Sequence, residues 1–232
     1  GASGGVVLDV FGFAGPGLQI TGGVTQVGVA GVFGGNHTGV LVDEGNQLVI
    51  VDGGIVEGNV DGIRVQPGNQ QLAIYHSQVF SNADNGIELH GGSTIAAGNL
   101  IFGNSGDGIH VSGTETGFNA FFDNSIGLTE EAAVLHYAPM PVTVDGNQGV
   151  GISIRGGSSE NRIARNMIVG NGSAGVLLTG AGTDNNVVEA NWIGVVPIAE
   201  QVGDTTTTFL KSDIDGTTTG NGTYGVEIAD GA

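Results

Sequence analysis

The sequence predicts an all-β fold, a β-solenoid of about ten stacked coils of 22–24 residues that forms a single domain over residues 1–232. Two observations predict it. A four-residue strand pattern recurs along the whole chain, and glycine and asparagine separate the short apolar runs, with no helical pattern between them.

The recurring pattern is a tetrad: a glycine, an aliphatic residue, any residue and a second aliphatic residue. Because the aliphatic residues alternate with a free position, each tetrad predicts a strand with one buried face. Successive tetrads begin 22, 23, 24, 22, 43, 24 and 50 residues apart, and we interpret the two long intervals as double periods. The tetrads begin at Gly17, Gly39, Gly62, Gly86, Gly108, Gly151, Gly175 and Gly225.

Each period also contains further short β-prone runs, such as residues 72–74, 99–102 and 166–169. Two or three short strands in about 23 residues fit one solenoid coil, stacked in parallel about 4.8 Å from the next. The 46 glycines follow no three-residue period and there are only five prolines, so a collagen-like chain is excluded.

Two segments depart from the period, near residues 127–146 and 195–220. We interpret both as loop insertions in the solenoid, because variable function tends to lie on loops of a rigid scaffold. The alternative is two extended coils with solvated turns.

Asparagine recurs just before the tetrad glycines. Stacked at one corner, these side chains would bond to the coils above and below and form a structural ladder. Its predicted members are Asn82, Asn104, Asn147, Asn171 and Asn221, with Asn36 and Asn59 one position nearer to their glycines. The alternative is N-glycosylation at the three that begin an Asn-x-Ser/Thr sequon: Asn36, Asn171 and Asn221.

The charge excludes one class of partner. Five basic and 23 acidic residues give a net charge of -18, which would repel nucleic acid. No apolar run is long enough to insert into a membrane. The acidic, lysine-poor composition is typical of an exported surface, so we expect an extracellular or cell-surface location.

The free middle positions of three consecutive tetrads give one candidate catalytic or binding column, Arg64, Glu88 and His110. Equivalent strand positions in stacked coils lie about 5 Å apart. A base, a carboxylate and an imidazole there could bind or process a uronic acid. The alternative is a surface charge ladder in which Glu88 offsets Arg64.

A second column precedes the tetrad glycines and offers oxygen ligands. Calcium is the one metal that such residues suggest, although no cofactor is required by the sequence. Ordinary polar turns are the alternative. The candidate ligands are Asp61, Asp84, Asn85 and Asp107.

A family resemblance spans nearly the whole chain and is clearest from about residue 99 onward. The runs "NNVVEANWIG" (185–194) and "GNGTYGVEIADGA" (220–232), joined by a threonine- and glycine-rich loop, resemble the right-handed parallel β-helix repeat proteins of bacterial and archaeal surfaces. Their fold is that of the pectate lyase superfamily. The resemblance implies right-handed coils, but it does not select a function, because such proteins include lyases, hydrolases, epimerases, adhesins and structural rods.

The signatures of those enzymes are missing from the chain, which has no Asp-Asp pair, no Gly-His-Gly and no Asp-Pro-His. We therefore expect a non-enzymatic extracellular structural or adhesive rod, a filament subunit or a segment of a larger surface protein. Its expected partners are further copies of the same chain, stacked end to end, or adjoining coils of a longer chain. The alternative is a polysaccharide-active enzyme or a glycan-binding module that uses the outer face.

Overall fold

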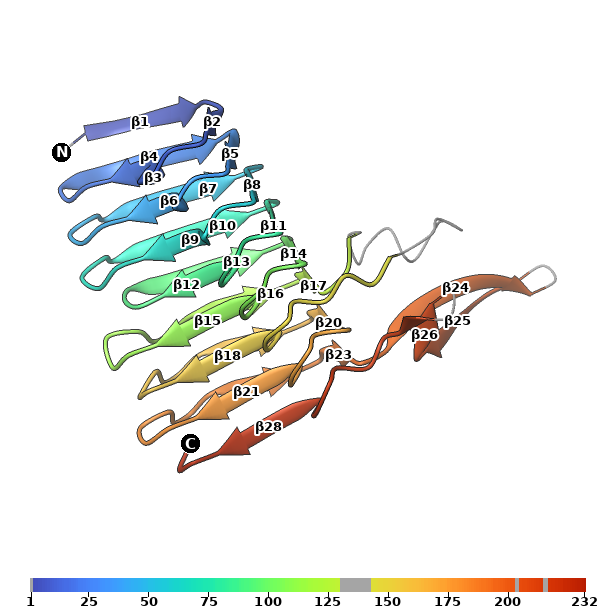
Figure 1. The fold of residues 1–232 in the computed structure, drawn as a ribbon. Helices are drawn as coiled ribbons and strands as arrows, with labels where there is room; N and C mark the ends of the chain where they lie inside the picture. The colour runs from blue at the N-terminus through green and yellow to red at the C-terminus, as the bar shows by residue number, and fades with distance from the viewer. Residues whose placement is uncertain (1, 130–142, 203–204, 215–216) are drawn as a thin grey trace.

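A computed structural model describes residues 2–129, 143–202, 205–214 and 217–232. Within these residues, three parallel sheets of eight strands each wind into a solenoid (Figure 1). Each turn gives one strand to sheet A, one to sheet B and one to sheet C. The predicted all-β, right-handed parallel β-helix is therefore confirmed. No helix in the described part of the chain is long and apolar enough to cross a membrane.

The strands are short and regular. Sheet A consists of β1 (Ala2–Val7), β4 (Val24–Ala30), β7 (Leu48–Asp52), β10 (Gln71–Tyr75), β13 (Ser93–Ala97), β16 (Ala120–Phe122), β19 (Arg162–Ala164) and β22 (Val187–Glu189). Sheet B consists of β2 (Val10–Phe11), β5 (Val32–Gly34), β8 (Ile55–Glu57), β11 (Gln78–Phe80), β14 (Leu100–Phe102), β17 (Ser125–Ile126), β20 (Met167–Ile168) and β23 (Trp192–Ile193). Sheet C holds the tetrads, in β3 (Pro16–Ile20), β6 (Thr38–Val42), β9 (Asp61–Val65), β12 (Ile87–Leu89), β15 (Ile109–Ser112), β18 (Ile152–Arg155), β21 (Val176–Thr179) and β28 (Val226–Ala229).

The described residues form eight turns, fewer than the roughly ten expected from the period. The two long intervals between tetrads are single turns. His110 pairs directly with Ser153, and Leu177 pairs directly with Glu227. The additional residues in these intervals leave the solenoid instead of forming another coil.

Both excursions leave at the corner between sheets B and C. The second forms an antiparallel pair, β24 (Val196–Val202) with β25 (Thr205–Lys211), which projects away from the stack in Figure 1, and a shorter pair, β26 (Asp213–Ile214) with β27 (Thr217–Thr218). The first begins with an antiparallel bridge between Leu128 and Val144. The remainder of the insertion expected near 127–146, residues 130–142, lies outside the described residues.

A small apolar cluster joins the two excursions to the solenoid. Leu128 of the first and Val196 of the second are both fully buried, and Met167 and Val169 of the turn between them complete the cluster. Trp192 packs against its edge. The two excursions are thus anchored on one shared patch beside the main core.

The main core consists of the inward residues of the three sheets. The two aliphatic residues of each interior tetrad point inward and stack on those of the next turn, while the middle residue faces outward. Burying one such Val, Leu or Ile contributes about 1.5–3 kcal/mol. Fully buried tetrad residues include Ile63, Val65, Ile87, Leu89, Ile109, Val111, Ile152 and Ile154.

The three corners share one design, a left-handed residue followed by a buried polar residue, usually asparagine. At the corner between sheets B and C, for example, Gly103 has a φ of 60° and precedes Asn104, and Ser81 has a φ of 54° and precedes Asn82. A left-handed residue turns the chain sharply, which suits glycine and is accessible to short polar residues.

The asparagines of the B–C corner form a continuous ladder. Asn104 Nδ2 donates to Asn147 Oδ1 (2.8 Å) and to the Val79 carbonyl (3.2 Å). Its Oδ1 accepts from the backbone N–H (3.1 Å) and Nδ2 (2.9 Å) of Asn82. The same backbone contact to the next amide recurs along the stack, whose members are Asn36, Asn59, Asn82, Asn104, Asn147, Asn171 and Asn221.

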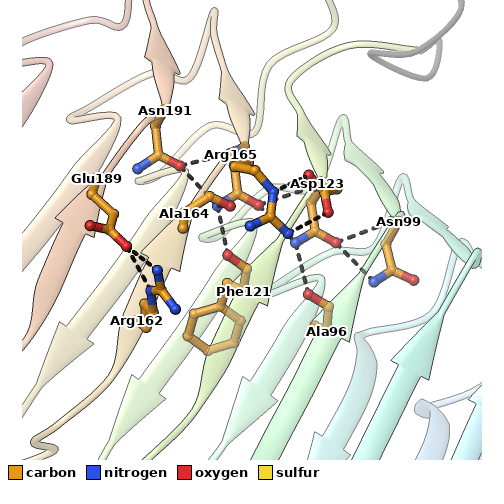
Figure 2. Close-up of polar contacts among 11 residues, drawn as sticks. Ala96, Asn99, Phe121, Asp123, Arg162, Ala164, Arg165, Glu189 and Asn191 are labelled. Atoms are coloured by element: carbon orange, nitrogen blue, oxygen red, sulfur yellow. Dashed lines mark hydrogen bonds and ion pairs between the residues drawn. The ribbon is translucent and has the colours of Figure 1, made fainter.

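Two further ladders lie at the other corners, and the sequence analysis missed both. At the A–B corner, shown in part in Figure 2, the stacked residues are Ser77, Asn99, Asn124, Asn166 and Asn191. At the C–A corner, Asn46 stacks on Asn69, and a second run comprises Asn119, Asn161 and Asn186.

The side-chain amides of the three sequon asparagines make hydrogen bonds within the ladder. Asn36 Nδ2 donates to the Val10 carbonyl (3.1 Å), and Asn171 Nδ2 donates to Asn221 Oδ1 (3.0 Å). Asn221 Nδ2 donates to the Ile168 carbonyl (3.2 Å). Asn36 and Asn171 are also buried. In the folded chain the three sequon amides are therefore bonded within the stack, as expected of ladder members.

The tetrad glycines are required by the same stacking. A β-carbon on Gly108 would lie 2.7 Å from the Gly151 carbonyl oxygen, 2.9 Å from Asn147 Nδ2 and 3.0 Å from Ile126. Two of these contacts are closer than side chains make, so any larger residue must push the next turn away. The absence of a β-carbon at Gly108 thus lets the asparagine ladder and the strands of sheet C keep the same distance between successive turns.

Replacing Gly108 with alanine tests this explanation. We expect Gly108→Ala to destabilise the fold by about 1–3 kcal/mol, because the methyl group overpacks against backbone that cannot move independently. Gly28→Ala in β4 is the matched control, since a β-carbon there has no atom within 4 Å. Thermal unfolding followed by circular dichroism measures both. Equal melting temperatures for the two variants would contradict the steric explanation.

A second substitution tests the ladder itself. We expect Asn104→Ala to lower the free energy of unfolding by about 1–3 kcal/mol, because the buried Val79 carbonyl and Asn82 N–H lose their partner. The exposed neighbour Gln148 provides the control, and Gln148→Ala should change stability by less than about 0.5 kcal/mol. Urea unfolding distinguishes the two. An Asn104→Ala variant as stable as the control would show that the ladder contributes no net stability.

Candidate functional site

The outer face of sheet C carries the densest group of charged side chains in the described part of the chain. Strand pairing places Glu88 directly between Arg64 and His110, as the register of the tetrads predicts. Ser153 of the next turn continues the column. We call the whole group the sheet C strip: Asp61, Arg64, Asp84, Glu88, His90, Asp107, His110, Ser153 and Arg155.

In the N-terminal half of the strip, Arg64 and Glu88 are at the centre. Arg64 Nη1 lies 3.1 Å from Asp61 Oδ2, and its Nε lies 3.2 Å from Glu88 Oε2. His90 Nε2 is 3.0 Å from Glu88 Oε1. Although these atoms are within ion-pair distance, Arg64 Nε, Glu88 Oε2 and His90 Nε2 have no hydrogen bond of good geometry. Charge attraction brings Arg64 and Glu88 together, while part of the hydrogen-bonding capacity of this group stays unused.

Asp107 is the centre of the other half and is 8% exposed. Its Oδ1 accepts from the Val150 N–H (2.7 Å), and its Oδ2 accepts from Ser153 Oγ (2.6 Å). His110 Nδ1 is 3.1 Å from Oδ2, and Arg155 Nη2 is 3.5 Å from it. The carboxylate thus ties residues from two turns of sheet C together.

These contacts set the pKa of Asp107. Burial by itself would raise the pKa of this carboxyl, but the bonds from His110, Ser153 and the Val150 N–H, with the positive charge of Arg155, hold it below its ordinary value. Asp107 is therefore ionised and orients the imidazole of His110.

Asp84 is shifted in the opposite direction. Burial raises its pKa, and the negative charges of Asp61, Glu88 and Asp107 raise it further, against a smaller opposing effect of His110. The strip thus contains Asp107, whose pKa is lowered by hydrogen-bond donors, and Asp84, whose pKa is raised by burial and by neighbouring negative charge.

The predicted calcium ligands lie along the strip, but protein donors engage several of their oxygens. Asp61 contacts Arg64, Asp107 accepts the bonds described above, and Asn85 Oδ1 accepts from the Asp107 N–H (2.8 Å). Among the described residues, no group of three or more His, Asp or Glu side chains is arranged to hold a metal ion.

An open hollow lies beside the strip, at the turns that follow the first three strands of sheet C. Its volume is about 800 Å³. Gln66, which lines it, directly follows the last residue of β9. The lining residues are Thr21, Gly22, Asp43, Glu44, Gly45, Gln66, Pro67 and Gly68.

Comparison with known proteins identifies the family. The family model described as "Right handed beta helix region" matches residues 7–126. The chain belongs to this β-helix family. No curated protein sequence matches it.

Two solved structures share the fold of this β-helix protein. They are the crystal structures of the periplasmic alginate epimerase AlgG and of a point mutant of it, with TM-scores of 0.54 and 0.55 at 18% and 19% sequence identity. Each match covers 88% of this chain and 45% of the other. The β-helix protein thus spans less than half the length of these structures, and at such identities the likeness shows the fold alone.

The β-helix protein has a second cluster of arginines, which the sequence did not reveal. Arg165 forms two bonds of 2.9 Å with the Asp123 carboxylate, and Arg162 pairs with Glu189 (Figure 2). Both guanidinium groups lie over the ring of Phe122, at 5.7 Å for Arg162 and 5.2 Å for Arg165. The side chains of these pairs are 45–56% exposed, so each pair contributes little to stability.

The opposite pKa shifts in the strip predict opposite pH effects. A lowered pKa stabilises the fold above the ordinary carboxyl value of 3.8, and this contribution is lost as the pH falls through the folded pKa. Asp107→Asn should therefore reduce stability at neutral pH, with a deficit that narrows in acid. Asp84→Asn should increase stability at neutral pH, and this gain should vanish as the pH falls to about 3.8. Urea midpoints across the pH range measure both. The same sign for both variants at neutral pH would refute the electrostatic description.

Proposed function

We propose that this β-helix protein is an extracytoplasmic adhesive scaffold that binds a carbohydrate polymer along the sheet C strip without chemical turnover. The observation that carries the proposal is the row of half-exposed donors, Arg64, His90 and Arg155, set beside carboxylates on one regular face. Their side chains are 35%, 27% and 41% exposed. Sugar hydroxyls both donate and accept hydrogen bonds, so they suit a surface that alternates donors with acceptors.

The unused polar atoms support the same ligand class. Arg64 Nε, His90 Nε2 and Arg155 Nε are buried without a hydrogen bond. Such atoms cost free energy unless a partner is supplied. A small rearrangement around a bound hydroxyl would supply it. The adjoining hollow, which Gln66 lines, extends the polar surface of the sheet C strip toward the N-terminal turns of the solenoid.

The proposed location outside the cytoplasm draws on composition and on the fold comparison. The chain has no cysteine and a net charge of -18. AlgG, whose fold it shares, is described as periplasmic.

End-to-end stacking is also part of the proposal. β28 is an edge strand of sheet C in which Val226 and Ile228, the apolar positions of a tetrad, are 42% and 66% exposed. Another coil of the same design, from the same chain or from a second copy, would cover these side chains and pair with the open strand edge.

A second candidate function is catalysis on a polysaccharide, favoured by the contact between Asp107 and His110. A carboxylate at Nδ1 of an imidazole orients it and leaves Nε2 available for proton transfer. Arg64 could neutralise the carboxylate of a uronate unit. AlgG, described as an alginate epimerase, shows that this fold can carry such chemistry.

A binding experiment with a product assay distinguishes the two functions. We expect calorimetry with a panel of acidic and neutral polysaccharides to find a ligand whose affinity falls about tenfold in Arg64→Gln, which corresponds to about 1.4 kcal/mol. Arg162→Gln on sheet A is the matched control and should leave the affinity unchanged. No new reducing ends, unsaturated sugars or epimerised units should form.

Two results would overturn the scaffold proposal. Product formation that is lost in both His110→Gln and Asp107→Asn would establish catalysis instead. An affinity unaffected by Arg64→Gln for every polysaccharide bound would remove the strip from the binding surface.

A further inference from the structure

A second surface, on the outer face of sheet B, has a different chemistry. Strand pairing aligns Phe11, Gly34, Glu57 and Phe80 in one column across four consecutive turns. Phe102 of the fifth turn extends the column. The column therefore contains aromatic rings at both ends, with a glycine and a carboxylate between them.

An open cleft of about 450 Å³ lies between these rings. Four of its eight lining residues are glycines, which let a ring lie close to the main chain. A β-carbon on Gly34 would be 2.8 Å from Cε1 of Phe11, so the Phe11 ring lies directly against Gly34. We call this feature the sheet B cleft, lined by Phe11, Gly12, Gly34, Gly35, Glu57, Gly58, Phe80 and Ser81.

The two aromatic walls of the cleft differ in their packing. Phe80 stacks on Phe102 with ring centroids 4.9 Å apart and planes 4° apart, which braces it from the side of the fifth turn. Phe11 is 56% exposed. The cleft thus combines one aromatic wall that is stacked on a neighbouring ring with a second wall that is more exposed.

Glu57 gives the cleft its charge. It is half-buried between the two rings, and no hydrogen bond or ion pair joins its carboxylate to another described residue. By contrast, Glu88 faces Arg64 and His90, and Asp123 faces Arg165. The sheet B cleft is therefore an anionic, aromatic-walled site.

We propose that the sheet B cleft binds an amino sugar unit of a glycan, with its ammonium group beside Glu57 and its ring between the aromatic walls. A cation near aromatic faces is stabilised by the ring quadrupole, and the bond to a carboxylate is charge-assisted. The net charge of -18 attracts cationic ligands over longer distances. A glycine-rich lining with aromatic rings on two sides fits a sugar ring better than a linear lysine side chain.

The proposal rests on the proposed function in one respect, that the ligand is a carbohydrate. The binding surface itself lies on another sheet and consists of other residues. No residue of the sheet C strip lines the cleft. Binding at one surface can therefore fail while binding at the other persists.

Calorimetry with glucosamine oligomers and with their N-acetylated counterparts, at a mildly acidic pH where the free amine is protonated, tests the proposal. We expect the free-amine oligomer to bind about tenfold more tightly than the acetylated one. Glu57→Gln should abolish this preference, and Phe11→Ala and Phe80→Leu should weaken binding. Glu115→Gln and Phe118→Leu, at exposed positions away from the cleft, are matched controls that should have no effect. Far-ultraviolet circular dichroism verifies that every variant is folded.

Three results would overturn the proposal. The first is equal affinity for free and acetylated oligomers. The second is a lysine oligomer that binds as tightly as the glucosamine oligomer and is insensitive to Phe11→Ala, which would reduce the interaction to overall charge. The third is loss of glucosamine binding in Arg64→Gln with no loss in Glu57→Gln, which would assign the ligand to the sheet C strip.

Discussion

The hydrogen bond from one stacked asparagine to the next is the interaction on which this fold depends. At each corner the chain leaves one sheet for another, so its N–H and C=O groups cannot all pair as they do within strands. The asparagine amide supplies the missing donor and acceptor inside the stack, and the left-handed residue before it makes the turn. Since the amides contact their equivalents in the next turn, they also fix the rotational position of every coil. The outward columns that carry the polar and aromatic surfaces follow from that alignment.

The sequence was most informative where the spacing of equivalent residues is constant. The tetrad and its asparagine keep nearly the same distance in most turns, so sheet C and the B–C ladder could be predicted. The A–B ladder was missed because Ser77 replaces asparagine in one turn and because its left-handed positions include His76 and Arg165, which are not typical turn residues. The strands of sheet B have only two or three residues, too few to display a period. The aromatic column on that sheet was therefore not visible in the sequence.

The constant spacing of the tetrads also determined which residues of the sheet C strip could be predicted from the sequence. Parallel stacking in register brings equal tetrad positions together, and this alone predicted that Arg64, Glu88 and His110 would be neighbours. The contributions of Ser153 and Arg155 to Asp107 were missed. His110 and Ser153 are 43 residues apart, and the sequence interpretation placed an additional coil between their turns. In the structure the intervening segment leaves the stack, and strands β15 and β18 pair directly. Sequence distance does not distinguish an additional coil from an excursion, because both return the chain to the same corner.

The position of the two excursions has a consequence for how such a chain can diversify. Each departs after a left-handed glycine, Gly127 or Gly194, and returns just before a ladder asparagine, Asn147 or Asn221. The amide ladder consequently runs past both without a break. The corner between sheets B and C can therefore accept insertions. A segment can be gained, exchanged or lost there while the register of the surrounding coils is preserved. A grafted epitope or enzyme-recognition loop placed there would project from the side of the solenoid, at an axial height set by the coil chosen to receive it.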